Sequence, residues 1–226
     1  MSIIITVICA FALTLLFGRF LIPALRALKA GQSIREIGPK WHNVKQGTPT
    51  MGGLMFYMGS IVGVCAGLTL MMKELQTIAG IVYTNQVISL CISMLTALGF
   101  GIIGFVDDYI KVVKKRNLGL KARYKIIGQV VVTAAFLYGQ YYIGHISTMV
   151  SIPFTDIRLE LGLRYYPIVF LGIIFMVNAV NLTDGIDGLA STVAFGIGIS
   201  LFYVSYYRSS TASIICISLA GAAVGF

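Results

Sequence analysis

Long apolar runs, separated by short polar segments, constrain this chain more than any other feature of its sequence. The hydrocarbon core of a bilayer is about 30 Å thick, and a helix needs about 20 apolar residues to cross it. Seven runs approach or reach that length: 3–25, 53–72, 87–106, 126–146, 165–180, 189–207 and 212–226. Only 11% of the 226 residues are charged, against about 25% in soluble domains. We therefore expect an all-α, polytopic transmembrane helix bundle of about seven spans, not a disordered chain or a soluble enzyme.

The Lys and Arg residues are distributed unequally between the two sets of loops. The loops after the first and third runs hold 12 of the 17 Lys and Arg residues, and the loops on the opposite side hold four. Basic residues collect in cytoplasmic loops. This asymmetry predicts an N-terminus outside the cell and two basic loops in the cytoplasm. We interpret the net charge of +9 as this topology signal, so the expected partner is the lipid bilayer and not a nucleic acid.

One segment on the predicted outer side has a different pattern. Within residues 151–163, Ile157, Leu159 and Leu161 alternate with charged residues. An alternation with a period of two is typical of a β-strand. We expect a short extracytoplasmic β-hairpin here, with an irregular loop as the alternative.

Acidic residues are rare, and four of the five on the predicted cytoplasmic side form two clusters at helix ends. The first cluster is Asp107 and Asp108, which close the third run. Lys111 follows them by four and three residues, so on a helix it can pair with either carboxylate. Ionisable groups at a membrane boundary are costly and therefore indicate a functional site. The alternative is a helix end with local ion pairs.

The second cluster has polar residues at intervals of three: Asn178, Asn181, Asp184 and Asp187. Gly185 and Gly188 disfavour a continuous helix through this segment. We expect the fifth helix to end near Leu182 and a glycine-bent turn to direct both aspartates into a shared cavity. The alternative is a polar turn between two spans. Carboxylates that can hold a divalent metal, together with basic side chains that neutralise phosphoryl oxygens, indicate phosphate chemistry.

The third polar segment, residues 38–53, reads G-P-K-W-H-N-V-K-Q-G-T-P-T-M-G-G. Lys45 could contact a phosphate, and Thr48 and Thr50 offer hydroxyls. The segment is not a Walker A loop, because no Gly-Lys-Ser/Thr follows. The alternative is that the Pro and Gly residues only shape the entry of the chain into the second helix.

Together these segments resemble the phospho-N-acetylmuramoyl-pentapeptide transferase family, within the polyprenyl-phosphate N-acetylhexosamine-1-phosphate transferases. The resemblance rests on residues 38–53, 104–111 and 178–190, and residues 47–53 are the most specific part. It implies a ten-helix, multi-pass enzyme of the bacterial plasma (inner) membrane, usually a homodimer, with its active site on the cytoplasmic side. The implied reaction requires Mg²⁺ and transfers phospho-MurNAc-pentapeptide from UDP-MurNAc-pentapeptide to undecaprenyl phosphate. Its products are UMP and lipid I, a precursor for peptidoglycan synthesis.

The resemblance also implies roles for individual residues. Asp107 and Asp108 match the family's catalytic pair. The candidate substrate-binding residues are Lys45, Thr50, Lys111, Lys125, Asn181, Asp184 and Asp187, with Lys121 as an alternative to Lys125. The candidate metal ligands are Asp107, Asp108 and Asn181.

Two routes are open for the implied reaction. Either the lipid phosphate attacks the donor's β-phosphorus directly while Asp107 or Asp108 takes its proton, or a carboxylate first forms a covalent intermediate. A phosphate monoester has a second pKa near 6, so positioning and charge neutralisation should contribute more than the base. The alternatives to this function are a GlcNAc-1-phosphate polyprenyl transferase, a membrane transporter and an inert membrane fragment.

The length of the last apolar run suggests how much of a family member the chain represents. This run spans about 15 residues, or about 22 Å of helix at 1.5 Å per residue. The family's pattern continues with an aspartate-bearing motif and a histidine-rich loop, neither of which matches a segment here. We expect residues 1–226 to form a single transmembrane domain that resembles the N-terminal two-thirds of the family and is incomplete at its C-terminus.

Overall fold

The structure is a computed structural model that describes residues 1–27, 50–75, 80–114, 119–144, 147–152, 155, 157–185, 187–207 and 210–226. Its helices are α1 (Ser2–Ala27), α2 (Gly53–Leu75), α3 (Gly80–Lys114), α4 (Ala122–Tyr142), α5 (Tyr165–Thr183), α6 (Leu189–Tyr206) and α7 (Ser210–Gly225). A short 3-10 helix, η2 (Gly162–Arg164), leads into α5, and β1 (Met149–Ser151) and β2 (Arg158–Glu160) form the described strands.

Each of the seven predicted apolar runs overlaps one of these helices. Five stretches are long and apolar enough to cross a membrane: Ser2–Ala27, Gly53–Met72, Asn85–Val113, Gly162–Thr183 and Leu189–Tyr206. α7 is apolar but shorter, and α4 is less apolar because it carries two basic residues and two glutamines. The prediction of an all-α, multi-pass membrane protein is confirmed.

Two helix boundaries differ from the expected ones and change where the charged residues lie. α3 continues past residue 106 to Lys114, so Asp107 and Asp108 lie within its last turns and not at its end. The reason is local, since Lys111 pairs with both carboxylates inside the helix, and such pairs stabilise helical turns. α4 begins at Ala122 and not at residue 126, which places Lys125 in its first turn.

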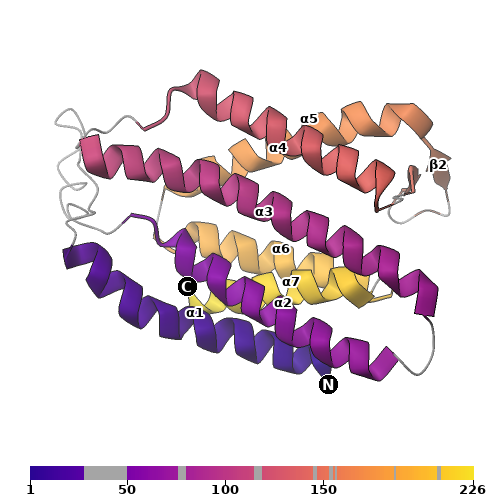
Figure 1. The fold of residues 1–226 in the computed structure, drawn as a ribbon, viewed down its shortest axis with the longest axis horizontal. Coiled ribbons are helices and arrows are strands. Elements are labelled where there is room, and N and C mark those ends of the chain that lie inside the picture. The colour runs from indigo at the N-terminus through magenta and orange to yellow at the C-terminus, as the bar shows by residue number, and fades with distance from the viewer. Residues whose placement is uncertain are drawn as a thin grey trace.

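The helices form two groups (Figure 1). In one group α1, α2 and α7 pack against one another and α6 packs on α7; in the other, α4 packs between α3 and α5. Figure 1 shows the ends of α1, α3 and α5 and the starts of α2, α4 and α6 at one end of the bundle. The N-terminus and the strands lie at the opposite end. Every described segment that carries predicted site residues therefore lies at the same end.

Small residues bring α1, α2 and α7 close together. Glycines recur every four residues on α2 at Gly59, Gly63 and Gly67. A Cβ on Gly63 would lie only 2.7 Å from the Cβ of Ala10 on α1. The Ser218 hydroxyl of α7 donates a hydrogen bond of 2.8 Å to the backbone oxygen of Ser60 on α2. Close packing of small residues is a main source of helix association in membranes, so this group holds the start of α2 in place.

Buried amides join α4 to both of its neighbours. The Gln140 side chain, 2% exposed, accepts a hydrogen bond of 2.8 Å from the Ser89 hydroxyl on α3 and donates one of 3.2 Å to the Ser89 backbone oxygen. Gln129, 1% exposed, exchanges amide hydrogen bonds of 2.8 and 3.3 Å with Asn178 on α5. Polar groups away from water need internal partners, so these pairs fix the register of α4 against α3 and α5.

The predicted β-hairpin is present. β1 pairs antiparallel with β2, with Val150 opposite Leu159. The Thr148 hydroxyl donates to the Glu160 carboxylate beside this pairing. The first strand begins at residue 149, just before the expected segment, and the hairpin lies at the opposite end of the bundle from the acidic clusters.

Candidate active site

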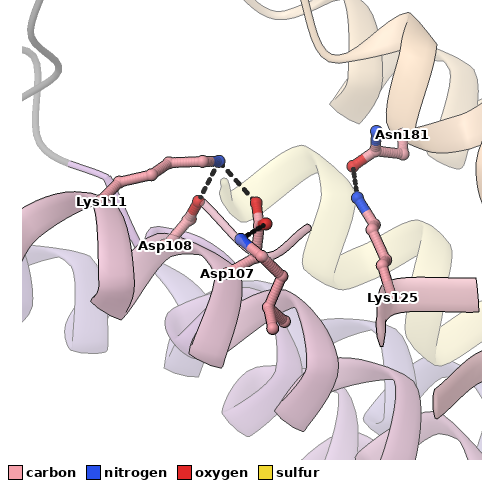
Figure 2. A network of polar contacts seen from close by, with 6 residues as sticks. Asp107, Asp108, Lys111, Lys125 and Asn181 are labelled. Carbon is pink, nitrogen blue, oxygen red and sulfur yellow. Dashed lines mark hydrogen bonds and ion pairs between the residues drawn. The ribbon is translucent and has the colours of Figure 1, made fainter. Parts of the chain in front are cut away.

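The two carboxylates of the first acidic cluster share one ammonium group (Figure 2). Lys111 Nζ lies 2.6 Å from Asp107 Oδ2 and 2.9 Å from Asp108 Oδ1. The spacing predicted pairing with either aspartate, and the structure shows both pairs at once, because positions three and four residues apart share a helix face. The Asp107 side chain is 14% exposed and the Asp108 side chain 32% exposed. The cluster therefore combines one largely enclosed carboxylate with a more accessible one.

The second oxygen of Asp107 is held by the segment that precedes α4. The Leu120 backbone N–H donates a hydrogen bond of 2.8 Å to Asp107 Oδ1. Gly119 lies so close that a Cβ there would be 2.7 Å from Asp107 Cγ. Both oxygens of Asp107 are thus hydrogen bonded, one by a side chain of its own helix and one by the backbone of the next segment.

A second polar group connects α4 with α5 on the other side of Asp107 (Figure 2). Lys125 Nζ donates a hydrogen bond of 3.1 Å to Asn181 Oδ1. Lys125 is also near enough for its charge to act on the Asp107 carboxylate. One helical turn away, after Lys125 on α4 and before Asn181 on α5, the Gln129–Asn178 amide pair holds the two helices together. The structure therefore brings Asp107, Asp108, Lys111, Lys125 and Asn181 to one region.

The second acidic cluster forms a turn, as expected. α5 ends at Thr183, and Gly188, with φ of +78°, is the N-cap residue of α6. Asp184 and Asp187 are both exposed at this turn. Among the described residues, no hydrogen bond or ion pair joins Asp184 to Asp107 or Asp108, and the shared cavity stays a prediction.

The candidates of the third polar segment are only partly described. Lys45 and Thr48 lie outside the described residues. Thr50 lies at a bend just before α2, followed by Met51 with φ of +70°. The ring of Phe226 packs edge to face on Phe56 with a centroid distance of 6.4 Å. Thr50 precedes α2, and the start of α2 lies at the same end of the bundle as the end of α3, which carries the carboxylates (Figure 1).

Sequence reasoning missed Gly119, Leu120 and Gln129. Gln129 had a detectable signal, since it is an amide inside a predicted span and such residues seek polar partners. Leu120 had none, because it acts through its backbone N–H, which every residue other than proline carries. Gly119 also had none, because nothing in the sequence shows that another backbone approaches it.

The oxygen ligands present would suit a metal bound together with a substrate. Among the described residues, no group of three or more His, Cys, Asp or Glu side chains could hold a metal ion. In the described part of the chain, the hydrogen bond and the ion pair of Asp108 are with Lys111 and involve Oδ1. Mg²⁺ is often held by one or two carboxylates plus phosphate oxygens and water. Asp108 fits that role. Both oxygens of Asp107 and the Oδ1 of Asn181 each already accept one hydrogen bond, and their role as metal ligands stays a prediction.

The arrangement suits chemistry on phosphates. Two ammonium groups, on Lys111 and Lys125, can neutralise phosphoryl oxygens. The more accessible carboxylate, Asp108, can accept a proton or share a divalent cation with a phosphate. These groups come from α3 and α4, and Asn181 of α5 orients Lys125. The groups at this end of the bundle are therefore of the kinds that bind phosphates.

Comparisons with known proteins cover the whole chain. Residues 89–226 match the family model of glycosyl transferase family 4, and residues 45–56 match the phospho-N-acetylmuramoyl-pentapeptide-transferase signature 1. One relative, a phospho-N-acetylmuramoyl-pentapeptide-transferase of Bacillus mycoides strain KBAB4, is 43% identical over 229 residues. Relatives of the same name from Bacillus anthracis strain A0248 and Bacillus thuringiensis strain Al Hakam are each 41% identical. Each alignment covers 100% of this chain and 66% of the relative.

The matched ranges include the candidate site residues. The family model spans Asp107 to Asp187, and the signature spans Lys45 and Thr50. The chain spans 66% of the length of the curated relatives it matches. Because the family model matches more than half of its residues, this chain belongs to glycosyl transferase family 4, in the branch of the phospho-N-acetylmuramoyl-pentapeptide-transferases.

Proposed function

We propose that this protein transfers phospho-MurNAc-pentapeptide from UDP-MurNAc-pentapeptide to undecaprenyl phosphate, forming lipid I and UMP for peptidoglycan synthesis. The observation that carries this proposal is the pair Asp107 and Asp108, bridged by Lys111 and faced by Lys125 at one end of a membrane helix bundle. The names of the relatives support phospho-N-acetylmuramoyl-pentapeptide as the transferred group, and the donor and the acceptor follow from the family resemblance. A membrane enzyme is required because the acceptor is a lipid.

The proposed reaction is a displacement at phosphorus. An oxygen of undecaprenyl phosphate attacks the β-phosphorus of the donor, a new P–O bond forms, and the bond to the UMP oxygen breaks. An acceptor that still carries a proton gives it to a carboxylate, for which we propose the more exposed Asp108. Both Asp107 oxygens are hydrogen bonded, which supports direct attack over a covalent intermediate on that residue.

The basic side chains would bind the phosphates of donor and acceptor. Lys111 and Lys125 lie on either side of Asp107, and Lys45, Thr50, Asp184 and Asp187 are proposed to complete the nucleotide site. Mg²⁺, when bound by Asp107 and Asp108, would supply additional positive charge for the diphosphate of the donor, from which UMP leaves. Asn181 would act by orienting Lys125, to which it is hydrogen bonded.

We further propose that the site faces the cytoplasm of a bacterium, in its inner membrane. Lys111, Lys121, Arg123 and Lys125 belong to the end of α3 and the start of α4, at the site end of the bundle, whereas Arg158 and Arg164 belong to β2 and η2 near the opposite end. Basic residues favour the cytoplasmic side. UDP-linked donors are soluble in the cytoplasm, so a site on this side can reach them. A homodimer is proposed from the family resemblance alone.

The test is an assay of UMP release by the full-length protein in nanodiscs with undecaprenyl phosphate. We expect Mg²⁺-dependent release from UDP-MurNAc-pentapeptide and little from UDP-GlcNAc, with Asp108→Asn as the matched inactive control. Preferential use of UDP-GlcNAc would instead establish a GlcNAc-1-phosphate transferase. No release with either donor would reject the transferase function.

A further inference from the structure

Asp107 is enclosed by a backbone segment that no sequence motif marks. Gly119 follows Asp107 by twelve residues, yet a Cβ at Gly119 would lie 2.7 Å from Asp107 Cγ and 2.8 Å from the Asp107 backbone oxygen. Carbon atoms in contact ordinarily stay about 3.5 Å or more apart. Only glycine therefore allows the segment to pass Asp107 this closely, and the segment covers both the side chain and the backbone of that residue.

The same segment supplies a hydrogen bond that fixes the carboxylate. The Leu120 N–H donates to Asp107 Oδ1 at 2.8 Å, while Lys111 holds Oδ2 at 2.6 Å. A carboxylate held at both oxygens from opposite sides has little freedom to rotate. Asp108, by contrast, has one contact among the described residues and is more exposed. The two aspartates thus differ in how firmly they are held, although they are adjacent in sequence.

This contact does not serve α4 itself. Leu120 precedes Lys121, the N-cap residue of α4. The first hydrogen bonds of that helix run from the amides of Tyr124 and Lys125 to the Lys121 oxygen. The Leu120 N–H takes no part in these helix bonds, and the hydrogen bond that it donates goes to Asp107.

We propose that Gly119 and Leu120 are positioning residues that hold the Asp107 carboxylate in its reactive orientation between Lys111 and Lys125. Gly119 makes room for the approach, and the Leu120 amide supplies the hydrogen bond. The proposal rests on the proposed transferase function for its kinetic consequence, but the contact itself can be measured without any substrate.

The kinetic arm compares variants of the full-length protein in nanodiscs. Gly119→Ala should lower kcat for UMP release about 100-fold, because a displacement of about 1 Å in an active site can cost that much. KM for the UDP-linked donor should change less than kcat, since Asp107 would act on the donor only through Mg²⁺ and not by direct contact. The matched control is Gly101→Ala, on α3, where a Cβ meets nothing within 4 Å. Equal kcat values for the two alanine variants would overturn the proposal.

A second pair of variants isolates the amide. Leu120→Pro removes the N–H without removing a hydrogen bond of α4, and Leu120→Ala keeps it. We expect kcat of the proline variant at least about tenfold below that of the alanine variant, with similar melting temperatures. Equal kcat values in two folded variants would show that the hydrogen bond does not position Asp107.

The structural arm uses hydrogen exchange at the Leu120 amide and needs no activity. The amide should exchange slowly in the wild-type protein, at least about tenfold faster in Asp107→Ala, and at the wild-type rate in Asp108→Ala. If the Leu120 amide exchanges at the same rate in Asp107→Ala as in the wild-type protein, the contact is absent and the proposal fails. If exchange responds as expected but the wild-type protein releases no UMP, the contact stands and the transferase function is what fails.

Discussion

At the scale of single residues, the two neighbouring aspartates of α3 have different surroundings. Asp107 is held at both oxygens, by Lys111 and by the Leu120 N–H. Asp108 shares Lys111 through one oxygen and is more than twice as exposed. Adjacent residues on a helix point about 100° apart, so one carboxylate contacts the segment before α4 while the other is more exposed.

Neutralising either aspartate should impair turnover of the full-length enzyme. We expect Asp107→Asn and Asp108→Asn each to lower kcat by about 10²-fold or more, the usual effect of removing one preorganised electrostatic group. UMP release measures this effect, and circular dichroism confirms folding. Near-normal turnover of both variants would refute a catalytic role for the pair.

Lys111 has a testable role in holding both carboxylates. Lys111→Met removes the shared cation and leaves two carboxylates on adjacent residues without it, whereas Lys111→Arg keeps the charge. We expect kcat of the methionine variant to fall by about 10²-fold or more. The arginine variant should retain part of the wild-type kcat, because it keeps the positive charge. Equal activities of the two variants, measured by UMP release, would contradict a role for this charge.

At the scale of the helices, buried amides and small residues decide which helices meet. The Gln129–Asn178 pair joins α4 to α5 one turn away from the Lys125–Asn181 contact. Gln140 joins the other end of α4 to Ser89 of α3. α4 therefore carries its charged first turn to a defined place between its neighbours.

The amide pair can be measured by a double-mutant cycle of Gln129→Leu and Asn178→Leu. Interhelical hydrogen bonds in membranes average about 0.6 kcal/mol and reach about 2 kcal/mol, and we expect a coupling free energy of unfolding in that range. Reversible unfolding in mixed detergent micelles gives the four free energies. Strict additivity would show that the two side chains do not stabilise each other.

The close contact of α1 with α2 and α7 predicts a cost for adding a single methyl group. Gly63→Ala would place its Cβ 2.7 Å from the Cβ of Ala10, and overpacking of this kind typically costs about 1–3 kcal/mol. The control is Gly172→Ala on α5, where a Cβ meets nothing within 4 Å. Melting temperatures in detergent should fall for the first variant and not for the second.

At the scale of the whole molecule, the bundle separates two kinds of surface. The end of α3, which carries both carboxylates, lies at one end with the starts of α2 and α4, and the β-hairpin and the N-terminus lie at the other (Figure 1). The five long apolar helices between them match the thickness of a bilayer,. A soluble nucleotide donor and a lipid acceptor could therefore meet at the site end, where water and membrane adjoin.

The orientation of the bundle can be tested by cysteine labelling in intact cells. In a background without the four native cysteines, a membrane-impermeant maleimide should label Ser151→Cys in the hairpin. It should label Lys121→Cys, before α4, only after the membrane is opened. The reverse pattern would place the site on the outer face and contradict the proposed cytoplasmic access.

Features with a short sequence range were predictable from the sequence. Runs of apolar residues predicted the helices, because crossing a bilayer requires both length and apolar composition. The i, i+3 and i, i+4 spacing predicted the pairing of Lys111, and the alternation in residues 157–161 predicted the hairpin. Each of these depends on residues within a few positions of one another, so the periodicity of the chain expresses it directly.

Contacts between distant parts of the chain were decided only by the packed bundle. Leu120 and Asp107 are 13 residues apart, Gln129 and Asn178 are 49 apart, and Lys125 and Asn181 are 56 apart. Whether such groups meet depends on where a helix ends, on the path of the segment between helices and on the register of their packing. A backbone N–H also looks the same at nearly every position. The charged residues that lie together at this end were therefore predictable from the sequence, whereas the groups that contact Asp107 and Lys125 depended on how the helices pack.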